Sequence, residues 1–186
     1  MTPVPTAVRR LCRAIEIGAA LFVLSVIAIY VISWAWPELT LRTHAAVPRI
    51  HLAGLATSAL AALSPSERLL VAAASLPYLA ALAWAFYRLI RMLRRFEQGR
   101  FFERESVSDL RAFSGLLLVS KLLALAAMHL RVAIAMHLLG PEKMGPVTIN
   151  LSSDELAILL LCALFFAIAA MMEEGRKLAE ENRGFV

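Results

Sequence analysis

The sequence predicts an all-α membrane protein, a bundle of four transmembrane helices. Three observations lead to this fold class. Of the 186 residues, 60% are apolar and only 18% are charged; the apolar residues gather in four long runs; and the basic residues concentrate in alternate connecting segments. A soluble globular chain has about 45–50% apolar and about 25% charged residues. The apolar excess is therefore expected to face lipid, which excludes a soluble enzyme with its own core.

Each apolar run is close to the length that crosses the hydrocarbon core as a helix, about 20 residues. A segment exposed to lipid must satisfy its own backbone hydrogen bonds, so all four runs are expected to be helical. The expected spans are residues 15–36, 68–90, 112–138 and 155–173, within a single integral membrane domain over residues 1–186. The first run ends in Trp34-Ala35-Trp36-Pro37 and lacks the small residues of a cleavage site, which predicts an uncleaved signal-anchor.

Capping and breaking residues mark the expected ends of the helices. Ser64-Pro65-Ser66-Glu67 has the pattern of a capping box with proline at the first helical position, and Ser152-Ser153-Asp154-Glu155 repeats it before the last span. Gly99 and Gly140-Pro141 are suited to the ends of the second and third helices. Pro77 lies within the second span and predicts a kink near Ala73.

The basic residues predict the orientation of the chain. Thirteen of the nineteen Lys and Arg residues lie before the first span, between the second and third (with Arg88 at the end of the second span), or after the fourth, whereas the other two loops, with Arg68 at the start of the second span, hold four. By the positive-inside rule, both termini, the loop 91–111 and the tail 174–186 are expected in the cytoplasm. The loops 37–67 and 139–154 are then expected on the outer face. Within them, residues 50–63 suit a short helix on the outer surface, and residues 147–151 suit a strand that pairs with 39–43.

Two short segments carry a recognisable pattern. The chain reads Gly99-Arg100-Phe101-Phe102 followed by Ser106-Val107 and Leu110-Arg111 between the second and third spans, and Gly175-Arg176-Lys177-Leu178-Ala179-Glu180-Glu181-Asn182 after the fourth. These segments resemble the loop and tail of domain-of-unknown-function family 2975, a bacterial family of four-span inner-membrane proteins. Ser106 stands where asparagine is common, and Arg183-Gly184-Phe185-Val186 replaces the usual Leu-Thr-Val-like end. The resemblance implies an inner-membrane location and, through neighbouring helix-turn-helix proteins, regulation across the membrane.

Two charged residues of the third span are candidates for a ligand or ion pathway. Lys121 is expected near the bilayer midplane, where a charge indicates either function or a side chain that reaches toward the cytoplasmic surface or pairs with Glu16 or Glu173. Arg131 is expected near the outer surface and leans into the bilayer, so it requires a polar vestibule, headgroup contact, or an acid. The acids in reach are Glu38, Glu67 and Asp154.

The four histidines, His44, His51, His129 and His137, all fall on the expected outer half and are low-ranking metal ligands. No HExxH or CxxC spacing accompanies them, so hydrogen-bonded histidines at the interface are the simpler interpretation, and we expect no metal or other cofactor. Cys12 and Cys162 are expected to be unpaired. No nucleophile motif or phosphate-binding glycine loop is present, which predicts that the protein is not an enzyme.

The basic run Arg88, Arg91, Arg94 and Arg95 is expected to contact anionic lipid headgroups rather than nucleic acid. Beyond it, the loop and tail form the largest expected polar surface, either a solvated face or a docking face for a cytoplasmic partner. The candidate docking residues are Phe101, Phe102, Glu103, Glu105, Asp109, Glu180, Glu181 and Asn182.

Two functions follow from these residues. The first is a membrane regulator or scaffold without enzymatic activity, whose loop and tail engage a soluble partner such as a helix-turn-helix regulator. The alternative is a small transporter or ligand sensor, with a polar cavity around Lys121 and Arg131. Beyond the lipid bilayer and such a partner, the sequence specifies neither ligand nor oligomeric state.

Overall fold

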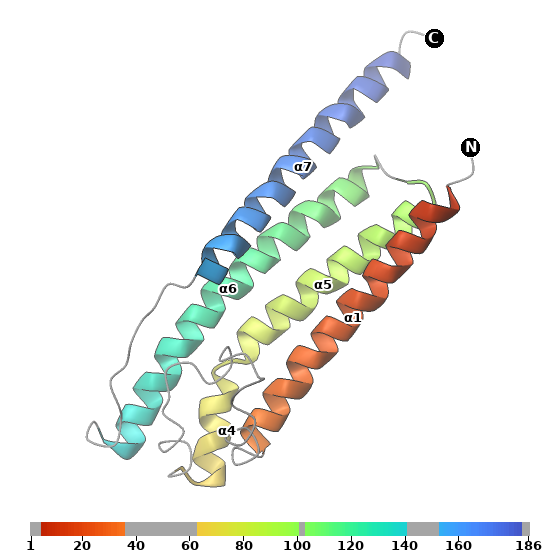
Figure 1. Cartoon of the computed structure of the whole chain (residues 1–186). Coiled ribbons are helices and arrows are strands. Elements are labelled where there is room, and N and C mark those ends of the chain that lie inside the picture. The colour runs from red at the N-terminus through yellow and green to blue at the C-terminus, as the bar shows by residue number, and fades with distance from the viewer. Residues whose placement is uncertain (1–4, 36–62, 101–102, 141–152, 184–186) are drawn as a thin grey trace. The chain divides into compact units, whose positions relative to one another are not determined.

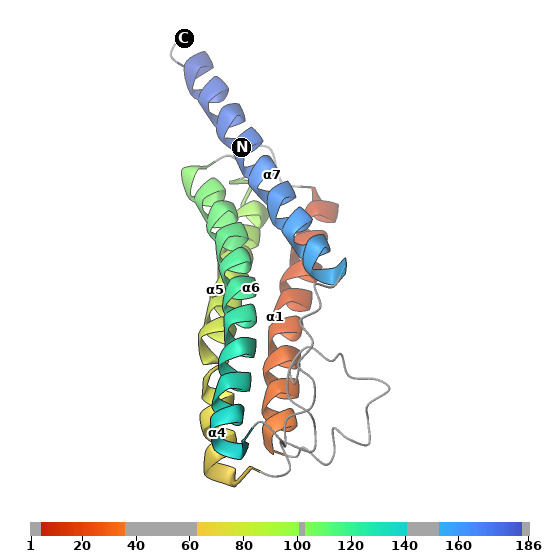
Figure 2. The ribbon, with the colours of Figure 1, turned by 90° about the vertical axis from the view of Figure 1, so that its left-hand side faces the viewer.

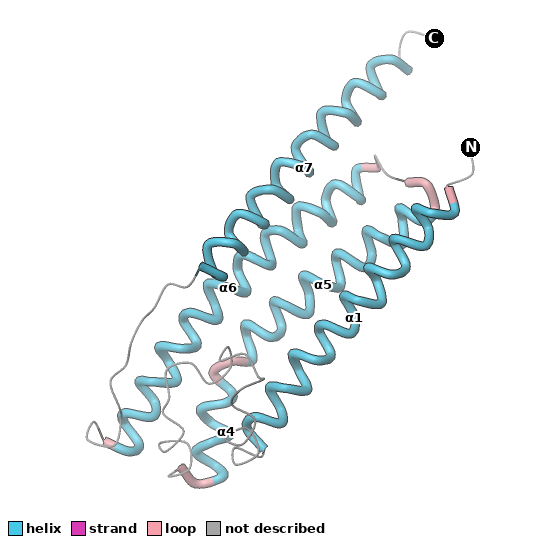
Figure 3. The backbone as a smooth tube through the Cα atoms, viewed as in Figure 1, coloured by secondary structure: helices cyan, strands magenta, loops and turns pink. Residues whose placement is uncertain are grey.

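The described part of the chain is helical throughout. The computed structural model describes residues 5–35, 63–100, 103–140 and 153–183, and among these residues Figure 3 shows helices and loops but no strand. The helices are α1 (Thr6–Ala35), α4 (Pro65–Ala73), α5 (Leu76–Glu97), α6 (Arg104–Leu139) and α7 (Ser153–Arg183), in this order along the chain in Figure 1. The all-helical prediction is confirmed. The outer helix expected at 50–63 and the strand pair at 39–43 and 147–151 lie outside the described residues.

The helices have the length and apolarity of membrane spans. Three of them, α1, α6 and α7, are each long and apolar enough to cross a membrane, and α4 and α5 together give a fourth when the bent pair is counted as one span. Large apolar side chains on these helices are exposed, among them Leu24, Leu69 and Leu160 at 62%, 72% and 72%. Lipid is the solvent in which such a surface is stable.

The helices begin and end where the local chemistry predicts. The Ser64 backbone N–H donates to Glu67 Oε2 at 2.7 Å and the Ser64 hydroxyl accepts from the Glu67 N–H at 3.4 Å, so the capping box before α4 is confirmed. Gly99 has a φ of 78°, and bonds from Arg100 N–H to the Arg95 carbonyl and from Gly99 N–H to the Phe96 carbonyl complete a Schellman motif after α5. Gly140, with a φ of 81°, ends α6. The Ser152 motif lies outside the described residues.

Pro77 breaks the second predicted span instead of only kinking it. α4 ends at Ala73, α5 begins at Leu76, and the two helices meet at an angle of 47°. Figure 3 shows the loop that separates them, and Figure 2 shows both helices from another side. Proline has no N–H to donate to the carbonyl four residues earlier. That carbonyl belongs to Ala73, the residue at which the kink was predicted.

The described chain divides into two compact units, to each of which α1, α5 and α6 contribute. The first comprises residues 1–23, 81–119 and 152–186. Its core includes Cys12 of α1, Met92 of α5, Phe113 of α6 and Cys162 of α7. Neighbouring rings of Phe22, Phe86, Phe113 and Phe165 are in contact, with centroids 5.2–5.9 Å apart, and so link all four helices.

The second unit comprises residues 24–80 and 120–151. Its apolar core includes Leu63, Val71 and Ala135, with Trp34 packed against them. Buried polar side chains accompany this core, among them Ser33, Ser75 and Arg131. A buried polar group requires a hydrogen-bond partner, so these residues determine how this unit can pack.

Candidate functional site

A carboxylate bound by three arginines lies where α5 and α6 meet in the first unit. Asp109 accepts from Arg88 Nη1 at 3.0 Å, from Arg91 Nε at 2.9 Å and Arg91 Nη2, and from Arg95 Nη1 at 2.7 Å. We call these four residues the arginine cluster. The Asp109 side chain is fully buried, whereas the side chains of Arg88, Arg91 and Arg95 are 26%, 38% and 20% exposed. Asp109 therefore has its carboxylate oxygens satisfied from one neighbouring helix.

Helical periodicity explains why three arginines reach one carboxylate. Arg88, Arg91 and Arg95 are spaced i, i+3 and i+7, which places them along one face of α5. On α6, Asp109 follows Ser106 and Val107, both buried, and precedes buried Leu110. The Ser106 hydroxyl donates to the Arg100 carbonyl at 2.8 Å and closes the turn between the helices. The recognisable loop motif is therefore a structural element that presents Asp109 to α5.

The arginine cluster lies outside the apolar stretch of α6. At about 1.5 Å per residue, a helix of this length extends about 54 Å, whereas the hydrocarbon core is about 30 Å thick. The charged residues Arg104 to Arg111 precede the apolar stretch of α6, which begins at Ala112. Burial, the largest influence, opposes ionisation of Asp109. Hydrogen bonds from Arg91 and Arg88 and the nearby positive charges outweigh it and hold the pKa of Asp109 below its ordinary value.

The sequence interpretation of this region needs two corrections. Asp109 was expected on an exposed docking face, but it is buried because α5 supplies its partners. The basic run was expected to contact lipid headgroups, with no acidic partner in the protein, but three of its arginines bond Asp109 and Arg94 bonds Glu16 at 2.6 Å. Glu16 therefore pairs with Arg94, and Glu173 pairs with Arg176 at 2.8 Å, so the acids proposed for Lys121 are bonded to arginines.

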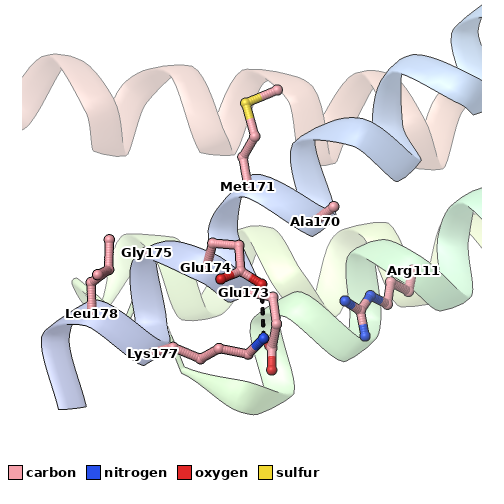
Figure 4. Close-up of a pocket in the computed structure, with 8 residues that line it drawn as sticks. All are labelled: Arg111, Ala170, Met171, Glu173, Glu174, Gly175, Lys177 and Leu178. Carbon is pink, nitrogen blue, oxygen red and sulfur yellow. Dashed lines mark hydrogen bonds and ion pairs between the residues drawn. The ribbon is translucent and has the colours of Figure 1, made fainter. Parts of the chain in front are cut away.

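A groove lies between α6 and α7, at the end of the first unit that contains the arginine cluster. It has a volume of about 570 Å³, and Figure 4 shows Arg111 of α6 directed toward charged side chains of α7. Met171 and Leu178 add apolar surface and are 65% and 60% exposed. We call this feature the α6–α7 groove; it is lined by Arg111, Ala170, Met171, Glu173, Glu174, Gly175, Lys177 and Leu178.

Ion pairs organise the α7 wall of this groove. Lys177 Nζ lies 2.7 Å from Glu174 Oε1, and Arg176 lies 2.8 Å from Glu173, both at i, i+3 spacing. Pairs at this spacing on a helix contribute only a few tenths of a kcal/mol each to stability. Their effect is to surround two exposed apolar side chains with charge of both signs. Met171 and Leu178 were absent from the predicted docking residues, although Leu178 belongs to the recognisable tail motif.

The other predicted docking residues are only partly placed. Glu103 bonds Arg100 at 2.6 Å before α6, and Glu105 is exposed in the first turn of α6. Phe101 and Phe102 lie outside the described residues. Glu180, Glu181 and Asn182 belong to α7, but their side chains lie outside the described part.

A second polar group lies in the other unit, within the apolar stretches. Arg131 is 5% exposed, and its Nε donates to the Ala127 carbonyl at 3.3 Å, so the side chain leans toward the start of α6 as predicted. It also interacts electrostatically with Tyr30 and Tyr78. The Tyr30 hydroxyl donates to the Ala72 carbonyl at the break between α4 and α5. We call Arg131, Tyr30, Tyr78 and Ser75 the Arg131 cluster; the tyrosines and Ser75 were not predicted from the sequence.

The remaining predicted residues are not brought into a common site. Lys121 is half-buried on α6, ten residues and therefore about 15 Å along the helix from Arg131. Glu67, offered as a partner for Arg131, bonds Ser64 in the capping box. His129 and His137 are exposed on α6, whereas His44 and His51 lie outside the described residues. Within the described ranges, no three His, Cys, Asp or Glu residues form a group suited to a metal ion.

The fold and these clusters define a class of protein, one whose long apolar helices are suited to membrane spans and whose charged helix ends are held by ion pairs. The family model described as "Protein of unknown function (DUF2975)" matches residues 43–183, about three quarters of the chain. The chain belongs to this family, as its loop and tail motifs predict. No curated protein matches the chain, and no solved structure does.

We expect Asp109→Asn to destabilise the first unit by about 3 kcal/mol, because it leaves three arginines around a group without charge. Unfolding of the purified protein in detergent measures the change. Glu105→Gln is the matched control, since Glu105 is an exposed acid one turn earlier on α6, and it should change the free energy of unfolding by less than about 0.5 kcal/mol.

The same variant tests the ionisation of Asp109. A carboxylate with a lowered pKa stabilises the fold above its unfolded-state pKa, about 3.9, and loses this contribution as the pH falls through its folded-state pKa. The stability difference between the natural protein and Asp109→Asn should therefore be constant from pH 8 to pH 5 and shrink below pH 4. A difference that disappears near pH 6 would show that Asp109 is not held as an anion.

Proposed function

We propose that this protein is a regulator or scaffold of the bacterial inner membrane, without enzymatic activity, whose α6–α7 groove docks a soluble cytoplasmic partner. The observation that carries the proposal is the exposed apolar side chain of Leu178, which lies beyond the expected fourth span, 155–173, in a groove edged by Arg111, Glu173 and Lys177. An apolar anchor surrounded by charged residues is the usual composition of a protein-binding site.

The arginine cluster supports this proposal because it makes one wall of the groove rigid. Asp109 holds the first turns of α6 against α5, and Arg111 follows two residues later. A wall fixed before binding loses little conformational entropy when a partner docks. The volume of about 570 Å³ accommodates a few side chains of an inserted helix, not a whole domain.

The partner that we propose is a helix-turn-helix regulator that presents an amphipathic helix. Its apolar face would contact Leu178, and its charged flanks would pair with Arg111 on α6 and with the acids of α7. Phe101 and Phe102, in the loop before α6, are further candidate anchors from the sequence. In this arrangement the protein would hold the regulator at the membrane and away from DNA.

The topology belongs to the same proposal. We propose four spans, with α4 and α5 crossing as one bent span, and with both termini and the α5–α6 loop in the cytoplasm. The 47° bend at Pro77 and the excess of basic residues on alternate connections support this arrangement.

Reporter fusions test this topology. Fusions at Val186, after Gly99 and before Met1 should all report the cytoplasm, and a fusion in the loop 139–154 should report the outer face. Fusions at Met1 and Val186 that report opposite faces would exclude an even number of spans and place the groove or the N-terminus outside.

The docking proposal predicts that Leu178→Glu weakens partner binding at least tenfold, because it places a charge where an apolar anchor should insert. The measurement is crosslinking and affinity purification from native membranes, followed by a dissociation constant with the purified partner. The double variant Phe101→Ala plus Phe102→Ala tests the loop anchors in the same assay.

Leu11→Glu is the matched control. Leu11 of α1 is as exposed as Leu178, at 61% against 60%, and does not line the groove. Its substitution should leave binding unchanged. Equal binding by all variants, or equal loss in Leu178→Glu and Leu11→Glu, would contradict docking in the groove.

A second candidate function, a small transporter or ligand sensor, is favoured by the Arg131 cluster. Arg131 is a buried cation within an apolar stretch, and a helix break with fully buried Ser75 lies beside the tyrosines that face it. Broken helices and intramembrane charges are features of sites for polar ligands.

Cysteine accessibility tests this second candidate. After Cys12 and Cys162 are replaced by serine, Ser75→Cys beside the Arg131 cluster and Ser120→Cys beside Lys121 should react with a membrane-impermeant thiol reagent if water reaches a cavity there. Leu160→Cys, on the exposed apolar face of α7, should stay unlabelled. Ser75→Cys and Ser120→Cys that also stay unlabelled from both faces would exclude the cavity.

A further inference from the structure

The arginine cluster carries more positive charge than its acid neutralises. Arg88, Arg91 and Arg95 surround the single carboxylate of Asp109, which leaves a net charge of +2. The neighbouring Arg94 differs, because Glu16 neutralises it one for one. A net charge held at a partly desolvated site favours binding of a counter-anion.

The guanidinium groups retain donors for such an anion. Each guanidinium has five N–H groups. Arg88 and Arg95 each use one nitrogen on Asp109, and Arg91 uses two. Arg91 also keeps the largest exposed fraction of the three, 38%, so it is the residue most accessible to a ligand from outside. Planar, bidentate recognition of phosphate is the geometry in which arginine binds most strongly.

Aromatic residues on the same face of α5 indicate the source of that anion. Trp84 lies one turn before Arg88, and Tyr87 lies one turn before Arg91, with which it interacts. Both rings are more than half exposed, at 57% and 58%. Exposed Trp and Tyr beside basic residues, at the boundary between apolar and charged helix, are typical of the level of the lipid headgroups.

We propose that the arginine cluster is a binding site for the phosphate of one anionic phospholipid, with Arg91 as its principal contact and Trp84 and Tyr87 beside the glycerol and the first acyl carbons. The cluster thus has two anionic ligands. Asp109 is the internal one and holds α6, and the lipid phosphate is the external one and neutralises the remaining charge. This site is independent of partner docking in the α6–α7 groove, so either proposal can fail without the other.

Native mass spectrometry of the delipidated full-length protein tests the site, with phosphatidylglycerol, phosphatidylcholine and inorganic phosphate as separate probes. The natural protein should bind one phosphatidylglycerol at least tenfold more tightly than phosphatidylcholine. Arg91→Gln should weaken phosphatidylglycerol about fivefold, the effect of one basic residue near the surface. Asp109→Asn should strengthen it by a similar factor, because the internal competitor for the arginines is removed.

The opposite directions of these two effects separate binding from misfolding, since a variant that fails to fold does not gain affinity. Circular dichroism confirms the helical content of each variant. Arg94→Gln is the matched control: it removes the same charge from the same helix but belongs to a different ion pair, and its affinity should stay within twofold of the natural protein. Equal loss in Arg94→Gln and Arg91→Gln, equal binding of the two lipids, or inorganic phosphate binding as tightly as phosphatidylglycerol would overturn the proposal.

Discussion

The buried carboxylate of Asp109 is the constraint on which one end of the first unit depends. An ionised carboxylate removed from water is costly unless charged donors surround it, and α5 supplies three of them from one face. Few placements of α6 against α5 satisfy all three bonds, so the ion cluster specifies the position of α6 as well as stabilising it. The Schellman motif at Gly99 and the Ser106 hydrogen bond then close a short connection between the two helices. Because Arg111 lines the α6–α7 groove, this placement of α6 also determines the position of the groove.

The two units solve the problem of buried charge differently. In the first unit, the charged ends of the helices pair with acids, and the remaining positive charge is accessible from outside. In the second, Arg131 lies among tyrosine hydroxyls and a backbone carbonyl, with the Tyr30 hydroxyl bonded at the break between α4 and α5. The break itself exposes backbone groups that an intact helix would satisfy internally, which explains why polar side chains gather there. Pro77 thus accounts both for the bend and for the polar groups that gather around Arg131.

Local signals predicted the helices well. The hydrophobic runs, the Ser64 capping box and the glycines at 99 and 140 have their predicted effects, and Pro77 breaks the helix where only a kink was predicted. The residues of the arginine cluster and of the Arg131 cluster were harder to predict from the sequence. Asp109 was assigned to an exposed face because nothing within its own segment shows that it is buried. The i, i+3, i+7 spacing of the arginines on α5 was the available signal, but it was explained by lipid contact alone.

The sequence by itself therefore determined the class of protein, the family, and the places where helices begin, bend and end. These depend on composition and on interactions between residues close in the chain. Only the tertiary structure decided which charges meet: Asp109 with arginines 14 to 21 positions away, Glu16 with Arg94, and Arg131 with tyrosines of two other helices. Such pairings depend on the rotation and register of one helix against another. A single sequence constrains them weakly, because many rotations bury similar amounts of apolar surface.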